Sequence, residues 1–441
     1  SQGMSVGAVR LREDADVIRR GCMAKGEDPA LVDQALAVDE QRRDLLGKGD
    51  AMRAQKKQIS DSIGLAIKGG AEPNGPQVAE LKERSNWISA ELAGIDGQLG
   101  EISARLDELL LRIPNPPDPG IPEGGEEASQ IVRTWGEPVT PHQEAATAEQ
   151  PAWERVPHWE IAEGLGIIDL AAGAKITGSG FPVYKGAGSA LQRALIDFFL
   201  DLHTTEHGMT EVWPPAVVNE DSARGTGQIP DKEDQMYVVT RDELYLAPTA
   251  EVPVTNIHRD EIIEAEDLPI RYVAYSPCFR REAGAAGAKT RGILRVHQFD
   301  KVEMVAFEKP SDSAETLEWM TERAEICLQR LGLPYRVKLM ATGDMGFTQA
   351  KKYDLVVWEP GVEDWLDVSY ISNFRDYQER RMAIRWRPEK GAKPEILHTL
   401  NGSGLALARV VAAILEVYQQ ADGSLVVPEV LRHRLGERIG P

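Results

Sequence analysis

Two long stretches near the start of the chain repeat an apolar residue at every seventh position. In residues 31–67 the repeat runs through Leu31, Val38, Leu45, Met52 and Ile59. In residues 78–113 it runs through Leu81, Ile88, Ile95, Ile102 and Leu109, and the intermediate position holds Leu92, Leu99, Leu106 and Ile113. This is the pattern of a coiled coil, and the Gly/Pro/Asn segment between the stretches predicts a turn. We therefore expect an antiparallel pair of helices, each roughly 55 Å long at ~1.5 Å per residue.

Such a hairpin buries only one row of apolar side chains between its two helices. Two interpretations of its function are open. One is a dimerisation or scaffold coiled coil. The other is a rigid arm that contacts a large partner. The first helix carries a cluster of basic side chains: Arg42, Arg43, Lys48, Arg53, Lys56, Lys57 and Lys68. Charged residues are common on any solvated coiled-coil face, so the cluster alone does not separate the two interpretations.

The remainder of the chain has a different pattern. Residues 114–152 are rich in Pro, Gly and Glu, which predicts a linker with little regular structure. Beyond them we predict a helix at 187–207, strands within 243–248, 270–279, 295–307, 353–360, 365–374 and 382–388, and a last helix at 403–420. Because strands follow one another without alternating helices, the pattern favours an α+β domain with a mainly antiparallel sheet and flanking helices.

Composition and charge narrow the class of protein. The chain has 441 residues, 42% of them hydrophobic, which is ordinary for a soluble globular protein. No window reaches the roughly 18 apolar residues of a membrane span, and the three cysteines suggest neither a disulfide framework nor a zinc site. We therefore expect no membrane association and a cytoplasmic location. The net charge of −20 argues against nucleic-acid binding by the chain as a whole, although a local basic cluster weakens that argument.

Candidate chemistry centres on residues 278–292, which read CFRREAGAAGAKTRG. Arg280 and Arg281 end one predicted strand, Arg295 opens the next, and the small-residue loop between them suits movement over a ligand. Arg409 adds a further cation near the start of the last helix. Guanidinium groups form paired hydrogen bonds with phosphate oxygens, so a polyphosphate ligand is one interpretation. The other is that these arginines pair with acids on a sheet surface. The chain contains neither G-x-x-x-x-G-K-[ST] nor G-x-G-x-x-G.

Several long segments, in order, resemble the seryl-tRNA synthetases, a family of class II aminoacyl-tRNA synthetases. CFRREAGAAGAKTRGILRVHQFDKVEMV resembles motif 2 of that family, and LAPTAEVPVTNIHRDEI resembles its serine-binding T-x-E segment. HTLNGSGLALARVVAAILEVYQQADGSLVVPEVL resembles motif 3 and the C-terminal end. The region from FPVYKGAGSALQ to GTGQIP resembles motif 1, which forms the homodimer contact in the family. The N-terminal hairpin is similar to the family's tRNA-binding arm, so the resemblance extends from about residue 8 to 430.

The resemblance implies an α+β fold with a class II synthetase sheet, preceded by the two-helix coiled-coil arm. Residues 1–113 would be the tRNA-binding arm, 114–152 the linker and 153–441 the catalytic domain. The family uses ATP and Mg²⁺ to convert L-serine to seryl-adenylate, and then transfers serine to the 3′-terminal ribose of tRNA-Ser and of the selenocysteine tRNA. It acts as a homodimer in which the arm of one subunit serves the tRNA on the other.

The same resemblance implies roles for individual residues. Arg280 and Arg409 would be catalytic, with Arg280 holding both the α-phosphate and the serine carboxylate. ATP would be bound by Arg280, Arg281, Glu282, Val296, Asp367, Val368, Ser369, Tyr370 and Arg409. Serine would be bound by Thr249, Ala250, Glu251, Arg280, Glu303, Asn401 and Ser403. Asp367 would be the metal ligand.

The chain departs from the family pattern at a few of these positions. In DVSYISNF, Asp367 stands where Glu is usual, Tyr370 where Ser is usual, and Ile371 where a small residue is common. Val356 and Gly180 stand where the family has Glu and Arg. These departures keep two alternatives open beside a housekeeping seryl-tRNA synthetase. One is a catalytically altered paralogue that binds tRNA as a regulator. The other is a variant serving antibiotic biosynthesis or self-resistance.

Overall fold

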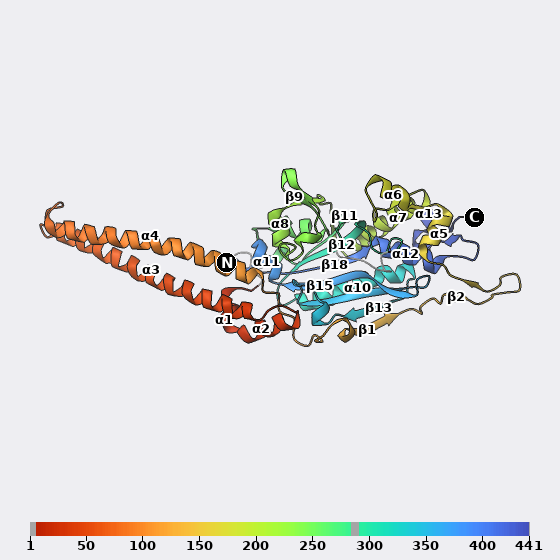
Figure 1. Cartoon of the computed structure of the whole chain (residues 1–441), viewed down its shortest axis with the longest axis horizontal. Helices are drawn as coiled ribbons and strands as arrows, with labels where there is room; N and C mark the ends of the chain where they lie inside the picture. Colours follow the sequence, from red (N-terminus) through yellow and green to blue (C-terminus); the bar gives the residue numbers. More distant parts are fainter. Residues whose placement is uncertain (1–5, 284–290, 441) are drawn as a thin grey trace. The chain divides into compact units, whose positions relative to one another are not determined.

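The computed structural model describes residues 6–283 and 291–440, and the chain divides into two compact units, one ending at Pro114 and one beginning at Asn115 (Figure 1). Most of the small-residue loop singled out above, residues 284–290, lies outside the described residues. Among the residues that are described, no helix combines the length and the apolar character that a membrane span requires.

The first unit is helical. α1 (Ala8–Glu13) and α2 (Ala15–Ala24) precede two long helices, α3 (Ala30–Lys68) and α4 (Pro76–Leu111), which lie side by side along their length (Figure 1). The predicted antiparallel hairpin is confirmed, with helix ends within two residues of the expected ones. Its buried seam consists of heptad positions and their neighbours: Val38, Ile59, Val78, Ile88, Ile95 and Leu106.

The base of the hairpin is the best-packed part of this unit. Leu11 of α1 and Ile18 and Cys22 of α2 form one buried cluster with Val32 and Leu110 of the long helices. Near the turn, by contrast, the side chain of Leu65 is 70% exposed. The short helices therefore supply the second layer that a two-helix seam lacks.

The second unit is built on an eight-stranded sheet in the order β1-β13-β14-β15-β18-β12-β11-β6. Its strands are β1 (Gln130–Trp135), β6 (Thr210–Val212), β11 (Ile270–Phe279), β12 (Gln298–Glu308), β13 (Tyr335–Leu339), β14 (Lys351–Glu359), β15 (Asp364–Arg375) and β18 (His398–Ala406). All neighbours pair antiparallel except β6 and β11, which are parallel. The predicted α+β class and antiparallel sheet are confirmed.

Three helices pack on this sheet: α7 (Ala187–Asp201), α10 (Ser313–Leu331) and α12 (Leu407–Tyr418). They share one large apolar core with the sheet. The smaller helices are α5 (His158–Leu165), α6 (Leu170–Ile176), α8 (Glu220–Gly225), α9 (Glu251–Thr255), α11 (Tyr377–Met382) and α13 (Arg432–Leu435). The short strands are β2 (His142–Gln143), β3 (Trp153–Glu154), β4 (Ile168–Asp169), β5 (Val183–Tyr184), β7 (Val217–Asn219), β8 (Val238–Val239), β9 (Leu244–Leu246), β10 (Ile262–Glu264), β16 (Arg385–Arg387), β17 (Glu395–Ile396), β19 (Leu425–Val426) and β20 (Arg438–Ile439).

The structure differs from two local expectations. Residues 114–152, expected to have little regular structure, include the strand β1, which pairs with β13 and forms one edge of the main sheet. The last helix does not begin at 403, because residues up to Ala406 continue β18 and pair with β12 and β15. In both places a partner strand distant in sequence supplies backbone hydrogen bonds that local composition does not reveal. The helix predicted at 187–207 is regular only to Asp201, and a π-helical turn follows at Leu202–Glu206.

A buried carboxylate at the base of the hairpin gives a stability prediction. Asp39 of α3 is fully buried and pairs with Arg12 of α1 at 2.8 Å, Arg42 at 3.0 Å and Arg43 at 3.2 Å. Burial acts to raise the pKa of Asp39, but the hydrogen bonds from Arg12 and Arg42 outweigh it and lower the pKa below 3.8. We expect Asp39→Asn to reduce the free energy of unfolding of the first unit by about 2 kcal/mol at pH 7.

The pH dependence follows from the sign of that shift. A lowered folded-state pKa contributes stability above the unfolded value and loses it as the pH falls through the folded value. Thermal unfolding of the full chain should therefore show a deficit for Asp39→Asn at pH 7 that shrinks below about pH 4. Asp33→Asn is the matched control, since Asp33 is 62% exposed in its pair with Arg19. An equal loss in both variants would contradict the prediction.

Candidate functional site

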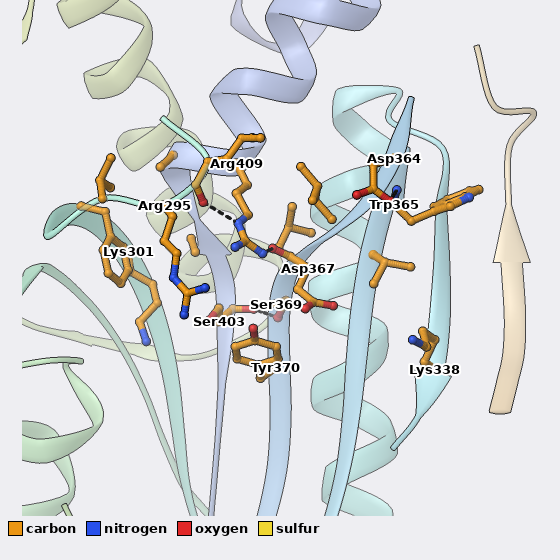
Figure 2. Close-up of a pocket in the computed structure, with 18 of the residues that line it drawn as sticks. Arg295, Lys301, Lys338, Asp364, Trp365, Asp367, Ser369, Tyr370, Ser403 and Arg409 are labelled. Carbon is orange, nitrogen blue, oxygen red and sulfur yellow. Dashed lines mark hydrogen bonds between the residues drawn. The ribbon is translucent and has the colours of Figure 1, made fainter. Parts of the chain in front are cut away.

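Two connected chambers open beside the centre of the sheet. The first has a volume of about 630 Å³ and lies over β12, β15 and β18 and the start of α12 (Figure 2). The second, about 480 Å³, extends toward α9 and the segment around residues 343–349. The residues that line both are Arg280, Glu282, Arg295, Lys301, Tyr370 and Ser403. We call the first the large chamber and the second the small chamber.

Arg280 and Arg409 face the large chamber without a carboxylate partner among the described residues. Arg280 follows β11, donates from Nε to the Pro248 carbonyl oxygen at 3.3 Å, and lies over the ring of Phe299. Arg409, in the first turn of α12, donates to the carbonyl oxygens of Leu294 at 2.8 Å and Asp367 at 3.1 Å (Figure 2). In the parts of the chain that the structure describes, neither forms an ion pair. Because carbonyl oxygens orient a guanidinium group without cancelling its charge, both arginines are available to an anion.

Only some of the residues that follow β11 line the chambers. Glu282 lines both chambers and accepts a hydrogen bond from Arg295 Nε at 2.9 Å. Val296 is largely buried and lines the large chamber. Arg281 does not line either chamber, because its Nη1 donates instead to the Asp234 carbonyl oxygen at 2.6 Å. Of the two adjacent arginines, the structure therefore brings only Arg280 to the site.

β15 contributes seven consecutive residues, 364–370, to the wall of the large chamber, and the predicted ATP-binding residues Asp367, Val368, Ser369 and Tyr370 are among them. Ser369 donates to the Ser403 carbonyl oxygen at 2.6 Å, which fixes β15 against β18. Tyr370 is 38% exposed and lines both chambers, with the Lys352 ammonium 4.2 Å from its ring centroid. Val356 lies directly opposite Asp367 in the β14–β15 register and offers no ligand atom.

The surroundings of Asp367 suit a divalent cation. Its side chain points into the large chamber, and the structure gives its carboxylate no hydrogen bond or ion pair among the described residues (Figure 2). Asp354, which lies opposite Tyr370 in the β14–β15 register, is buried, with Lys352 3.4 Å away. Burial raises the pKa of Asp354 to about 7, and the charges of Asp367 and Asp344 add to that rise while Lys352 opposes it. This convergence of negative charge fits a hard cation with oxygen ligands.

The small chamber holds the remaining predicted polar residues. Thr249 donates to Glu303 Oε2 at 3.1 Å, and Lys301 Nζ lies 2.6 Å from both Thr249 Oγ1 and Glu303 Oε2. Glu251 accepts from Gln378 Nε2 at 2.6 Å. Burial raises the pKa of Glu251, and the charge of Glu303 adds to that rise. Asn401 and Ser403 line the same chamber, whereas Ala250 lies in the apolar core beside it.

Sequence reasoning missed three residues that shape these chambers. Lys301 neutralises Glu303, and its position two residues earlier on the same strand face was a usable signal. Gln378 orients Glu251 from α11, and Lys352 approaches Tyr370 from β14. No local signal pointed to these two, because each reaches the site from an element distant in sequence.

Gly180 adjoins the site and has its own physical requirement. Its φ is +89°, and a Cβ atom built there would lie 2.3 Å from Cδ2 of His297. Any larger residue, arginine included, would therefore strain the backbone and collide with the imidazole.

Comparisons with known proteins agree over nearly the whole chain. Residues 9–117 match the seryl-tRNA synthetase N-terminal domain, and residues 237–418 match the class II core domain of the G, H, P, S and T synthetases. The serine–tRNA ligase of Gemmatimonas aurantiaca is 46% identical over 432 residues, covering 97% of this chain and 98% of that protein. That of Geobacter sulfurreducens is 46% identical and covers 98% and 99%. The structure resembles that of seryl-tRNA synthetase from Pyrococcus horikoshii complexed with ATP, with a TM-score of 0.91, 34% identity and 99% coverage of both chains.

The environment of Asp354 gives a pH prediction. Its folded-state pKa of about 7 lies above the ordinary 3.8, so the folded state keeps a proton that the unfolded state has already lost. Stability must then fall as the pH rises between these values. We expect Asp354→Asn, which cannot ionise, to gain stability relative to the parent chain as the pH rises from about 4 to about 8.

Thermal unfolding of the full-length protein across this pH range measures the effect. Asp267→Asn, at an exposed position of the same unit, is the control and should show a constant difference. A flat difference for Asp354→Asn would contradict the prediction, because it would mean that folding does not raise the pKa of Asp354.

Proposed function

The chain belongs to the seryl-tRNA synthetase family, and on this premise we propose which of its residues bind each substrate in the charging of tRNA with serine. It is a serine–tRNA ligase that activates L-serine with ATP and transfers the serine to the 3′-terminal ribose of tRNA-Ser. The observation that supports our division of roles is that the large and small chambers meet at Arg280. ATP occupies the large chamber, and serine occupies the small one.

In the first step, a carboxylate oxygen of serine attacks the α-phosphorus of ATP. The bond from that phosphorus to the bridging oxygen breaks, and pyrophosphate leaves with the electron pair. The step needs no enzyme nucleophile, so positioning and neutralisation of charge carry the catalysis. Arg280 lies where the two substrates meet and holds the α-phosphate and the serine carboxylate together. Arg409 binds the far end of the triphosphate.

The rest of the large chamber holds the nucleotide and its metal. Glu282 and Val296 lie beside the adenine. Asp367 would hold Mg²⁺, which would supply charge neutralisation for the phosphates. Val368, Ser369 and Tyr370 complete the wall contributed by the same strand.

Serine is too small to be selected by apolar fit, so the small chamber must select it through polar contacts. Because Lys301 already pairs with Glu303, we assign the serine ammonium group to Glu251, which lines the same chamber beside Thr249. Thr249, Asn401 and Ser403 contact the rest of the amino acid. A substrate that lacks the hydroxyl leaves buried polar groups unpaired, which costs binding energy.

In the second step, a ribose hydroxyl of the terminal tRNA nucleotide attacks the carbonyl carbon of seryl-adenylate, and AMP leaves. We assign tRNA binding to the α3–α4 hairpin, in a homodimer formed through the region that resembles motif 1. The selenocysteine tRNA is a second substrate in this proposal. We place the enzyme in the cytoplasm, where Mg²⁺, ATP and tRNA are present and where the three buried thiols stay reduced.

The hairpin's basic residues divide into two groups. Arg42 and Arg43 pair with Asp39, and Arg53 pairs with Asp50 and Asp96. Among the described residues, the structure gives no ion pair to the other members of the cluster, which are Lys48, Lys56, Lys57 and Lys68. These lysines are the candidates for contacts with tRNA phosphates and sugars.

Amino-acid-dependent ATP–pyrophosphate exchange tests the proposed function. With the twenty amino acids assayed separately in the presence of Mg²⁺, we expect exchange with serine alone. Glu251→Gln should raise the KM for serine by more than tenfold and leave the KM for ATP within twofold, since its partner is the serine ammonium group. Exchange with another amino acid, or none by folded protein that binds ATP, would contradict the proposal.

The hairpin assignment predicts a separate defect. Replacing Lys56 and Lys57 together by alanine should raise the KM for tRNA-Ser about tenfold, equivalent to about 1.4 kcal/mol, and reduce its salt dependence. Pyrophosphate exchange, which needs no tRNA, should not change. The control is the double variant Lys390→Ala and Lys393→Ala, which removes the same charge from exposed positions of the second unit. Equal losses in the two double variants would indicate a general charge effect.

A further inference from the structure

A buried group of one histidine and two glutamates lies away from the lining of both chambers. His158 begins α5, Glu359 ends β14, and Glu416 lies on α12. Their side-chain ligand atoms are within 4.8 Å of one another, and no other group of three His, Cys, Asp or Glu residues in 6–283 and 291–440 is that close. Such a group raises the question of a metal ion.

The hydrogen bonds of His158 answer that question. Its Nε2 accepts the backbone N–H of Ile293 at 3.1 Å, and its Nδ1 donates to Glu416 Oε2 at 2.7 Å. A neutral imidazole has one donor and one acceptor nitrogen, and both are in use here. No lone pair remains for a metal, so the group is a hydrogen-bonding junction between segments of the fold.

Glu416 is the centre of this junction. Its Oε2 also accepts the backbone N–H of His158 at 3.1 Å, and its Oε1 accepts the backbone N–H groups of Gly361 at 2.6 Å and Val362 at 3.0 Å. Glu416 therefore ties α12 to α5 and to the turn between β14 and β15. Burial, followed by the charge of Glu416, raises the pKa of Glu359 well above its ordinary value.

The same segments position Arg409. One of its carbonyl acceptors belongs to Leu294, the residue after Ile293, whose N–H is held by His158. The other belongs to Asp367 on β15, which begins directly after the turn held by Glu416. The contact around Ile293 is close, because a Cβ atom at Gly292 would lie 2.2 Å from His158 Nε2. Both carbonyl acceptors of Arg409 are thus carried by segments that the junction fixes.

We propose that His158 is a positioning residue for ATP binding, which holds the Arg409 guanidinium in place through the backbone of Ile293 and Leu294. The inference rests on the role proposed above for Arg409. His158 itself does not touch ATP, serine or tRNA. Its effect should therefore appear in ATP affinity and depend on the presence of Arg409.

The experiment measures the dissociation constant for ATP by calorimetry on the full-length protein, together with the KM for serine. His158→Phe retains an aromatic ring and removes both hydrogen bonds. In His158→Asn, the side-chain amide can still donate to Glu416 from the position of Nδ1, but no atom replaces Nε2 as the acceptor for the Ile293 N–H. We expect about tenfold weaker ATP binding for both, with the KM for serine within twofold. His158→Gln, whose amide can reach the Ile293 N–H, should recover most of the affinity. If His158→Phe does not fold, His158→Asn supplies the same comparison.

Glu359→Gln is the matched control, because Glu359 belongs to the same buried group but its carboxyl oxygens have no hydrogen-bond partner among the described residues, and glutamine has nearly the same shape. It should leave ATP binding unchanged. In an Arg409→Ala background, His158→Asn should have no further effect on ATP affinity, since a residue that acts through Arg409 has nothing left to position.

Three results would overturn the inference: unchanged ATP affinity in His158→Asn, equal weakening of ATP and serine, or a His158 effect that persists without Arg409. If Arg409→Ala alone binds ATP normally, the role assigned to Arg409 fails, and the inference fails with it. Failure of the role assigned to Arg409 can be told apart from failure of the inference about His158, because the Arg409→Ala variant is measured with His158 intact.

Discussion

The antiparallel register of β18 between β12 and β15 determines which side chains meet at the site. On one side Ser403 lies opposite Glu303, and on the other Gly402 lies opposite Ile371. Side chains directly opposite each other point to the same face of a sheet, so a slip of one residue would move every polar group to the wrong face. A Cβ at Gly402 would come within 2.8 Å of the Ile371 side chain, which shows how closely the strands approach there. The small chamber exists only in this register.

The sequence predicted what local patterns can encode. The heptads of the hairpin indicated its helices to within two residues, because every turn repeats the same signal. The resemblance to motifs 2 and 3 assigned Arg280, Glu282, Glu303 and Arg409 to one site, and all four line the chambers. Arg281 shows the limit of that reasoning. Successive side chains of an extended segment point to opposite sides, so one arginine of the pair had to leave the chambers. In the structure it binds the Asp234 carbonyl.

The remaining errors have one physical origin. β1 and the last part of β18 form because distant strands satisfy their backbone groups, and Gln378 and Lys352 reach the chambers from elements far away in sequence. Pairing across a sheet leaves little trace in the composition of either strand. A Pro- and Gly-rich stretch such as 114–152 can therefore contain an edge strand, since an edge must pair on one side only.

The chain has a net charge of −20, yet cationic side chains line the large chamber. The two observations are compatible because the net charge of a chain does not determine the charge at any one site. Arg280 and Arg409 are oriented by carbonyl oxygens, so their charge stays available to phosphate. In the small chamber Lys301 is neutralised by Glu303 at 2.6 Å, which leaves the carboxylate of Glu251 available to an ammonium group. An arginine that is paired with a carboxylate would have to give up that partner before it could bind phosphate, whereas a carbonyl-held arginine needs no such exchange. The same logic explains why the junction at Glu416 lies outside the chambers. Glu416 accepts four hydrogen bonds, which engage both of its carboxylate oxygens. A carboxylate placed inside the large chamber would repel the triphosphate.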